Sequence, residues 1–242
     1  QGPTIAFILN SKGTETVLTK FYYLDNSSLR FIAGAGAKTS KTLGYILHVT
    51  NSSSVTAPST VWYGGNRSVF IDTASRLYAD SIVINGGITG MWISSGSSCS
   101  CISASFTGGA SSVYGMIVTG ASNVTVKSST FSGYPTGISA NDASTVNASS
   151  SSFTGTSTSG ATIAIQATHG SVVTAYSATC NTFNYGANTQ YGGVITANGP
   201  CTFTSVTVGA LPQVGGIIYA YGTTYTVSQT VNVWTADGLI LR

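Results

Sequence analysis

Short apolar runs separated by Gly, Ser and Asn recur along residues 80–220. Each repeat has an aromatic or aliphatic anchor, and these anchors are Ile84, Phe106, Phe131, Phe153, Phe183 and Val208, spaced by 22, 25, 22, 30 and 25 residues. A second apolar run follows each anchor, as at residues 115–118, and a third, as at residues 124–126, leads into the next. Self-similarity at this period is typical of a solenoid.

The runs predict strands rather than helices. They alternate apolar residues with Ser or Thr, so Val124 and Val126 face one side of a strand while Thr125 and Lys127 face the other. A helix needs apolar residues three and four positions apart, whereas Gly, Ser, Thr and β-branched residues dominate here. Three such strands make one coil, and coils bury their apolar faces by stacking. We therefore expect an all-β fold, a single-stranded parallel β-helix.

The regularity of the pattern divides the chain into three parts. Regular β-helix coils are expected over residues 76–222, irregular strands or capping coils over residues 4–75, and strands that continue or close the solenoid over residues 223–242. Within the first part, strands are expected at residues 4–9, 17–24, 29–33, 45–49 and 68–72. Turns or loops are expected at residues 34–39, 51–60 and 185–193, and extra residues around 164–171.

Charge is scarce and unevenly distributed. Only 6% of residues are charged, where globular domains average about 25%. Residues 81–236 contain two charged side chains, Lys127 and Asp142, and such a surface is poorly suited to a phosphate backbone. No apolar run approaches the roughly 20 residues of a spanning helix, and the runs are shorter than the strands of a membrane barrel. We therefore expect neither nucleic-acid binding nor membrane insertion.

Four cysteines, Cys99, Cys101, Cys180 and Cys201, raise the questions of disulfides and metals. The first two would share one strand face, where a disulfide between them would be strained. Zinc sites use CxxC-type pairs with histidine, and the two histidines lie far away in the sequence. We expect all four to be small buried residues inside the coil, and we expect no metal or other cofactor.

The Ser-Phe-Thr-Gly turns at residues 105–108 and 152–155 and the Gly-Ile-Ser-Ala strand at residues 137–140 carry a resemblance. Such coils resemble the right-handed parallel β-helices of bacteriophage tailspikes and tail fibres. The resemblance covers residues 76–222 well and the rest loosely, and pectin-processing enzymes and autotransporters share similar coils. It implies a homotrimer, on the virion tail or otherwise extracellular, that binds bacterial surface glycans; many members of the family also cut them.

A glycan-binding site is expected at one corner of the coils. Its candidate residues are Tyr114, Tyr134, Tyr185, Asn188 and Tyr191. If the corners stack, these phenols line up along the solenoid with hydroxyl and amide groups between them. Flat aromatic faces with polar neighbours suit a neutral sugar chain. The alternative is that these tyrosines occupy loops without a role or pack against a neighbouring protomer.

Enzymatic activity stays open. Glycoside hydrolysis normally takes two carboxylates about 5–9.5 Å apart, and residues 81–236 offer only Asp142. A depolymerase would therefore use Asp72 and Asp80, meeting across a coil or at a protomer boundary. The alternative is that these two cap turns or pair with Arg67 and Arg76.

Two further classes share flat, Ser/Thr-rich solenoids, namely ice-binding proteins and bacterial surface proteins. Ice binding favours regular Thr-x-Thr ladders, whereas Thr is scattered here and the coil lengths vary. Ice binding therefore ranks below glycan recognition.

Overall fold

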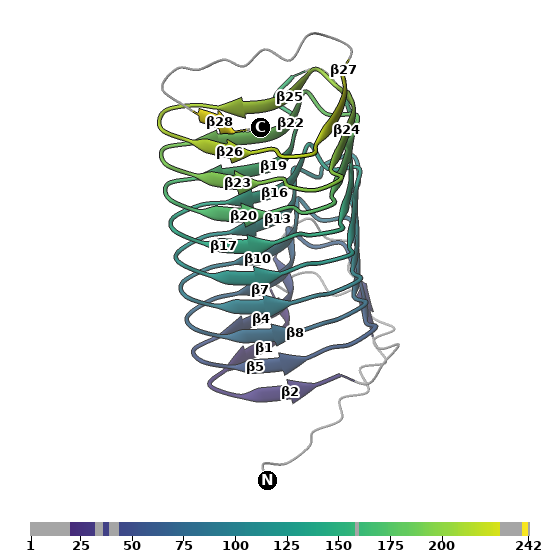
Figure 1. Cartoon of the computed structure of the whole chain (residues 1–242). Coiled ribbons are helices and arrows are strands. Elements are labelled where there is room, and N and C mark those ends of the chain that lie inside the picture. Colours follow the sequence, from purple (N-terminus) through teal and green to yellow (C-terminus); the bar gives the residue numbers. More distant parts are fainter. Residues whose placement is uncertain (1–19, 32–35, 39–43, 158–159, 228–238, 242) are drawn as a thin grey trace.

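The computed structural model describes residues 20–31, 36–38, 44–157, 160–227 and 239–241, and these ranges form a stack of β-coils (Figure 1). Strands are the regular elements throughout the described ranges, so the expected all-β solenoid is confirmed, with about nine turns. In the same ranges we find no helix that is both long enough and apolar enough to cross a membrane.

Each coil contributes one strand to each of three parallel sheets, in the chain order A, B, C. Sheet A consists of β1 (Lys20–Asp25), β4 (Tyr45–Thr50), β7 (Arg67–Ile71), β10 (Thr89–Ile93), β13 (Tyr114–Val118), β16 (Thr136–Ala140), β19 (Ile163–Thr168), β22 (Tyr185–Gln190) and β25 (Val208–Pro212). Sheet B consists of β2 (Ser28–Arg30), β5 (Ser54–Thr56), β8 (Arg76–Tyr78), β11 (Ser98–Ser100), β14 (Asn123–Thr125), β17 (Thr145–Asn147), β20 (Val172–Thr174), β23 (Val194–Thr196), β26 (Ile217–Tyr219) and β28 (Leu239–Leu241). Sheet C consists of β3 (Gly36–Lys38), β6 (Val61–Tyr63), β9 (Val83–Asn85), β12 (Ser105–Thr107), β15 (Thr130–Ser132), β18 (Ser152–Thr154), β21 (Thr179–Asn181), β24 (Thr202–Val206) and β27 (Thr224–Val227).

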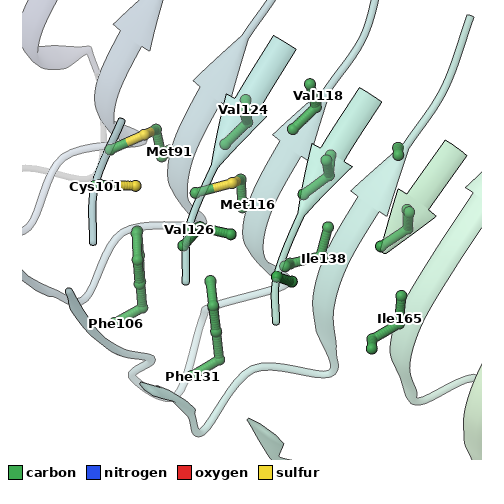
Figure 2. Close-up of a cluster of buried hydrophobic side chains, with 14 of the residues drawn as sticks. Met91, Cys101, Phe106, Met116, Val118, Val124, Val126, Phe131, Ile138 and Ile165 are labelled. Carbon is green, nitrogen blue, oxygen red and sulfur yellow. The ribbon is translucent and has the colours of Figure 1, made fainter. Parts of the chain in front are cut away.

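The core is a column of stacked apolar side chains. Phe106, Phe131 and Phe153 pair in register in sheet C, and their rings stack with centroids 4.5 and 5.0 Å apart. Aliphatic and sulfur-containing residues from sheets A and B, such as Met116 and Val124, fill the space opposite (Figure 2). Like residues recur in each coil because each layer must fill the same cross-section, which explains the repeat in the sequence.

One predicted register is wrong. Phe153 pairs with Cys180 in β21, and Cys180 pairs with Phe203 in β24, so neither Phe183 nor Val208 is the anchor of its coil. Phe183 is buried, but it lies in the corner that leads from sheet C to sheet A. The strand that contains Cys180 was not predicted, because cysteine is small and the search was for aromatic or aliphatic anchors.

The corner between sheets A and B combines strained backbone with a buried serine ladder. Two consecutive residues there have positive φ, for example Asp142 (55°) and Ala143 (57°). Just after this bend a buried Ser recurs, and the N–H of each serine donates to the hydroxyl of the serine in the next coil. This ladder runs through Ser27, Ser53, Ser75, Ser97, Ser122, Ser144 and Ser171. Buried N–H groups at the bends are thus satisfied by side chains.

The irregular-looking first third of the chain belongs to the same sheets. The strands expected near residues 29–33, 45–49 and 68–72 correspond to β2, β4 and β7, and β1 overlaps the one expected at residues 17–24. The strand expected at residues 4–9 lies outside the described residues. Three segments interpreted as turns or loops contain strands instead: β3 within 34–39, β5 within 51–60 and β22 within 185–193. The extra residues expected around 164–171 fall largely in the regular strand β19, and the long insertion precedes it.

Candidate functional site

The outer face of sheet A is the most chemically varied surface of the described structure. Met91 and Ile93 are fully buried in the core, so Trp92 between them points outward, as alternation along a strand requires. The residues in register with Trp92 form an outer row of eight side chains: His48, Phe70, Trp92, Ile117, Ser139, Gln166, Asn188 and Leu211. A parallel row consists of Tyr45, Arg67, Thr89, Tyr114, Thr136, Ile163, Tyr185 and Val208.

Four aromatic side chains gather at the β4–β10 end of these rows, and we call Tyr45, His48, Phe70 and Trp92 the aromatic platform. Phe70 is its centre: it stacks on Tyr45 (5.2 Å between centroids) and on His48 (4.7 Å), and Trp92 meets its edge at 6.2 Å. Tyr45, Phe70 and Trp92 are half-buried, so solvent reaches all three rings. In-register strands of a parallel sheet hold these rings at fixed spacing.

Arg67 lies over this platform. Its guanidinium carbon is 3.6 Å from the centroid of the Trp92 ring, 5.1 Å from that of Phe70 and 5.6 Å from that of Tyr45. One terminal nitrogen donates to the Tyr45 hydroxyl at 3.2 Å. A cation over an aromatic face is attracted by the ring quadrupole, which fixes the orientation of this long side chain.

A His–carboxylate pair borders the platform. His48 Nε2 lies 3.4 Å from Asp72 Oδ2, and the other carboxylate oxygen of Asp72 is buried without a hydrogen-bond partner in the described structure. Asp25 and Asp72 lie in a third outer row of sheet A, two coils apart, with Thr50 between them. The Asp25 carboxylate accepts a hydrogen bond from the Asn51 side-chain amide at 2.8 Å. Two strand spacings of about 4.8 Å separate the backbones of the two aspartates by about 10 Å.

Beyond β13 the same face becomes polar. Ser139 donates to the side-chain carbonyl of Gln166 at 3.1 Å, and Asn141 donates to Ser139 at 3.2 Å. Asn188 is 3% exposed and its side-chain oxygen has no partner among the described residues. Polar side chains therefore occupy the same row beyond Ile117, and of these Gln166 is half-buried while Ser139 and Asn188 are buried.

The structure does not bring the five predicted binding residues together. Tyr114 and Tyr185 do occupy one outer row of sheet A, separated by Thr136 and Ile163. Asn188 lies in the neighbouring row. These three therefore share the face that carries the platform: Tyr114 lies in the coil next to Trp92, and Tyr185 and Asn188 lie beyond Tyr114 with two coils in between.

The other two tyrosines lie elsewhere. Tyr134 is 1% exposed, with its hydroxyl 3.4 Å from the carbonyl oxygen of Gly86, and burial raises its pKa far above the usual value. Tyr191 is 53% exposed at the corner between sheets A and B, where its ring stacks on His169 at 4.9 Å. The four tyrosines therefore do not line up at one corner, because they occupy different positions within their coils.

The predicted catalytic pair is also separated. Asp72 ends a strand of sheet A, whereas Asp80 lies beyond β8 at the corner between sheets B and C. Asp80 accepts from the backbone N–H of Ile102 in the next coil at 2.9 Å and from the Ser100 hydroxyl at 3.4 Å. Asp80 thus stabilises a turn, which was the alternative considered for it.

All four cysteines are buried with free thiols, as expected from the sequence. Burial raises the pKa of Cys180, and the pKa of Cys99 is raised by its hydrogen bond with Cys101 and by burial. Within the described ranges no group of three or more His, Cys, Asp or Glu side chains is arranged to hold a metal ion.

Sequence reasoning missed the aromatic platform because three of its four residues lie within residues 4–75, which were interpreted as irregular. A signal was present: His48, Phe70 and Trp92 follow one another at intervals of 22 residues, the length of the shortest coils. Searching for polar or aromatic residues one coil length apart, outside the anchor positions, finds this row.

No family model matches the chain, and neither the curated proteins nor the solved structures contain a significant match.

Proposed function

We propose that this chain is a segment of a phage tail fibre or tailspike, a right-handed parallel β-helix that recognises a glycan on the host cell surface. The observation that carries the proposal is the aromatic platform on the outer face of sheet A, with the half-buried amide of Gln166 further along the same row. Half-buried aromatic rings offer stacking surfaces for the apolar faces of sugars, and hydroxyl and amide groups match sugar hydroxyls.

Two properties of the fold support recognition of an extended chain. The rows run along the solenoid with one side chain per strand, at about 4.8 Å, so successive sugars meet successive coils. The backbone beneath is fixed by in-register parallel pairing, so a ligand orders few groups on binding. A solenoid that presents such rows is suited to bind a polymer.

A glycan array with matched variants tests this proposal. We expect the wild-type chain to bind a subset of bacterial surface polysaccharides. Trp92→Ala should weaken that binding by about tenfold or more, because it removes an aromatic ring on which the Arg67 guanidinium stacks. Tyr63→Ala, which removes a 41% exposed aromatic from sheet C, is the control and should bind like wild type. Absence of binding to every glycan, or equal losses in both variants, contradicts the proposal.

The proposed assembly is a homotrimer of parallel protomers. In its C-terminal half, the outer face of sheet B carries an uncharged aliphatic row in register: Val172, Val194, Ile217 and Leu239. Residues 143–236 contain no charged side chain, so like faces can meet without burying a charge. Sedimentation equilibrium should give three times the chain mass of 24.7 kDa, and a monomer at micromolar concentration would count against the trimer.

A second candidate function is depolymerisation of the bound glycan. It is favoured by Asp25 and Asp72, which put two carboxylates in one outer row beside the platform, with their backbones about 10 Å apart. In this version Asp72 and its neighbour His48 act on a sugar held by the platform. Incubation with a polysaccharide bound in the array would then shorten the polymer, and Asp72→Asn and Asp25→Asn would each stop the shortening. An intact polymer after long incubation leaves recognition alone.

A further inference from the structure

Arg67 is a cation without an anionic partner. Among the described residues, the one contact within 4.0 Å between a basic and an acidic side chain joins His48 to Asp72. Within the part of the chain that the structure describes, Arg67 has one polar partner, the Tyr45 hydroxyl, which takes one of its five N–H donors. The remaining donors of this half-buried guanidinium face solvent or the platform.

The orientation of Arg67 is nevertheless fixed. Three rings, those of Trp92, Phe70 and Tyr45, lie within 5.6 Å of the guanidinium carbon. A guanidinium held in one plane is preorganised to bind a planar carboxylate through two parallel N–H donors, because little side-chain entropy remains to be lost. The cation–π contacts hold the guanidinium in place, and the N–H donors that Tyr45 does not take leave it able to bind an anion as well.

Charge on the rest of this face is consistent with a single anionic group. Among the side chains described on the outer face of sheet A, Arg67 carries the one permanent positive charge. Asp72 lies in a different outer row and is already bonded by His48, so it does not neutralise Arg67. A highly charged polyanion would find one partner here, whereas a sugar with one carboxylate finds its match.

We infer that the platform binds an acidic saccharide, with a sugar carboxylate on Arg67 and the apolar face of the same or the next sugar against Phe70 and Trp92. The inference rests on the proposed glycan recognition and specifies its ligand class. The half-buried amide of Gln166 then faces neutral sugars further along the chain.

The test uses immobilised glycans that contain uronic or sialic acid, the same glycans after reduction of their carboxyl groups, and sulfated glycans. Wild type should bind the carboxylated form more tightly than its reduced counterpart by about tenfold or more, as a charge-assisted hydrogen bond provides. Arg67→Gln should bind both forms equally, at the level of wild type with the reduced form. Arg67→Lys should keep part of the preference, because it retains the charge and loses the planar fork.

Control variants separate the possible failures. Arg76→Gln removes an exposed arginine from sheet B and should keep the preference of wild type. Circular dichroism melts of Arg67→Gln report whether the fold is intact. Equal binding of carboxylated and reduced glycans by wild type, with loss in Trp92→Ala, overturns the acidic ligand and leaves glycan recognition standing. Sulfated glycans bound as well as carboxylated ones overturn the assignment to a carboxylate, and binding to no glycan overturns both proposals.

Discussion

Gly137 leaves the space that the ring of Phe153 occupies in the same coil. A methyl group at Gly137 would lie 2.6 Å from Cδ1 of Phe153 and 2.5 Å from the carbonyl oxygen of Ala164. Gly115 and Phe131, and Gly186 and Phe203, stand in the same relationship. In the coil whose anchor is the small Cys180, the corresponding position holds Ala164 rather than Gly. Within one coil, a large side chain in sheet C thus goes with a glycine in sheet A, and a small side chain in sheet C goes with an alanine in sheet A.

Gly137→Ala should therefore destabilise the chain by about 1–3 kcal/mol, the usual cost of overpacking. Phe153→Cys alone should cost more, because it leaves a cavity. The double variant should be more stable than the sum of the two losses by about 0.5 kcal/mol or more, since the smaller side chain makes room for the methyl group. Urea unfolding of the four proteins measures the coupling. Strict additivity would show that the two positions do not share space.

The serine ladder predicts a second stability effect. Ser122 accepts from the Ser97 N–H at 3.2 Å and donates to the Thr119 carbonyl at 2.7 Å, all of it buried or half-buried. Ser122→Ala removes the hydroxyl acceptor of the Ser97 N–H, which keeps its bond to the Ser94 carbonyl at 3.2 Å, and should cost about 0.5–1.5 kcal/mol. Ser98→Ala, on the outer face of sheet B, is the matched control and should change stability by less than about 0.5 kcal/mol. Equal unfolding free energies for Ser122→Ala and Ser98→Ala would show that the serine ladder does not contribute to stability.

Tyr134 predicts an alkaline effect. Burial raises the pKa of Tyr134 well above its usual value of 10.0, so above pH 10 the unfolded chain releases this proton while the folded chain retains it. The free energy of unfolding therefore falls as pH rises, by about 1.4 kcal/mol per pH unit for one proton. Tyr134→Phe should lack this part of the decline, whereas Tyr191→Phe, at an exposed site, should keep it. Denaturant unfolding between about pH 9 and pH 11 gives the slope of the unfolding free energy against pH for each variant. Equal slopes for Tyr134→Phe and Tyr191→Phe would mean that Tyr134 is exposed to solvent.

The four buried thiols predict slow chemistry in the native state. Burial raises the pKa of Cys180 and Cys201, and the thiolate is the form that reacts. A thiol-specific chromogenic reagent should therefore react slowly with native chain and should detect four thiols after unfolding. More than one rapidly reacting thiol in the native protein would mean that the coil opens at these positions.

The sequence was sufficient for the repeat, the strand character and the buried cysteines, because each coil must fill the same cross-section with residues of the same kind. It was insufficient where small residues hold structural positions. Cys180 takes the place of an aromatic anchor, and β22 carries Asn188 and Thr189 where apolar residues were sought.

The candidate site was harder to predict than the fold. The direction in which Tyr134 and Tyr191 point depends on the position of each residue within its coil. An error of three residues in the register, such as the one between Cys180 and Phe183, changes that position. The platform spans residues 45–92, across the expected boundary between irregular and regular coils at residue 76, so its 22-residue spacing was overlooked until β4, β7 and β10 were aligned.

A crystal structure of the chain with an acidic oligosaccharide that binds in the array tests the central claim most directly. We expect a sugar ring against Phe70 and Trp92, with its carboxylate on Arg67 and the remaining sugars extending along the outer face of sheet A. A ligand bound to sheet B, or at the corner that carries Tyr191, with the platform empty, would contradict the account.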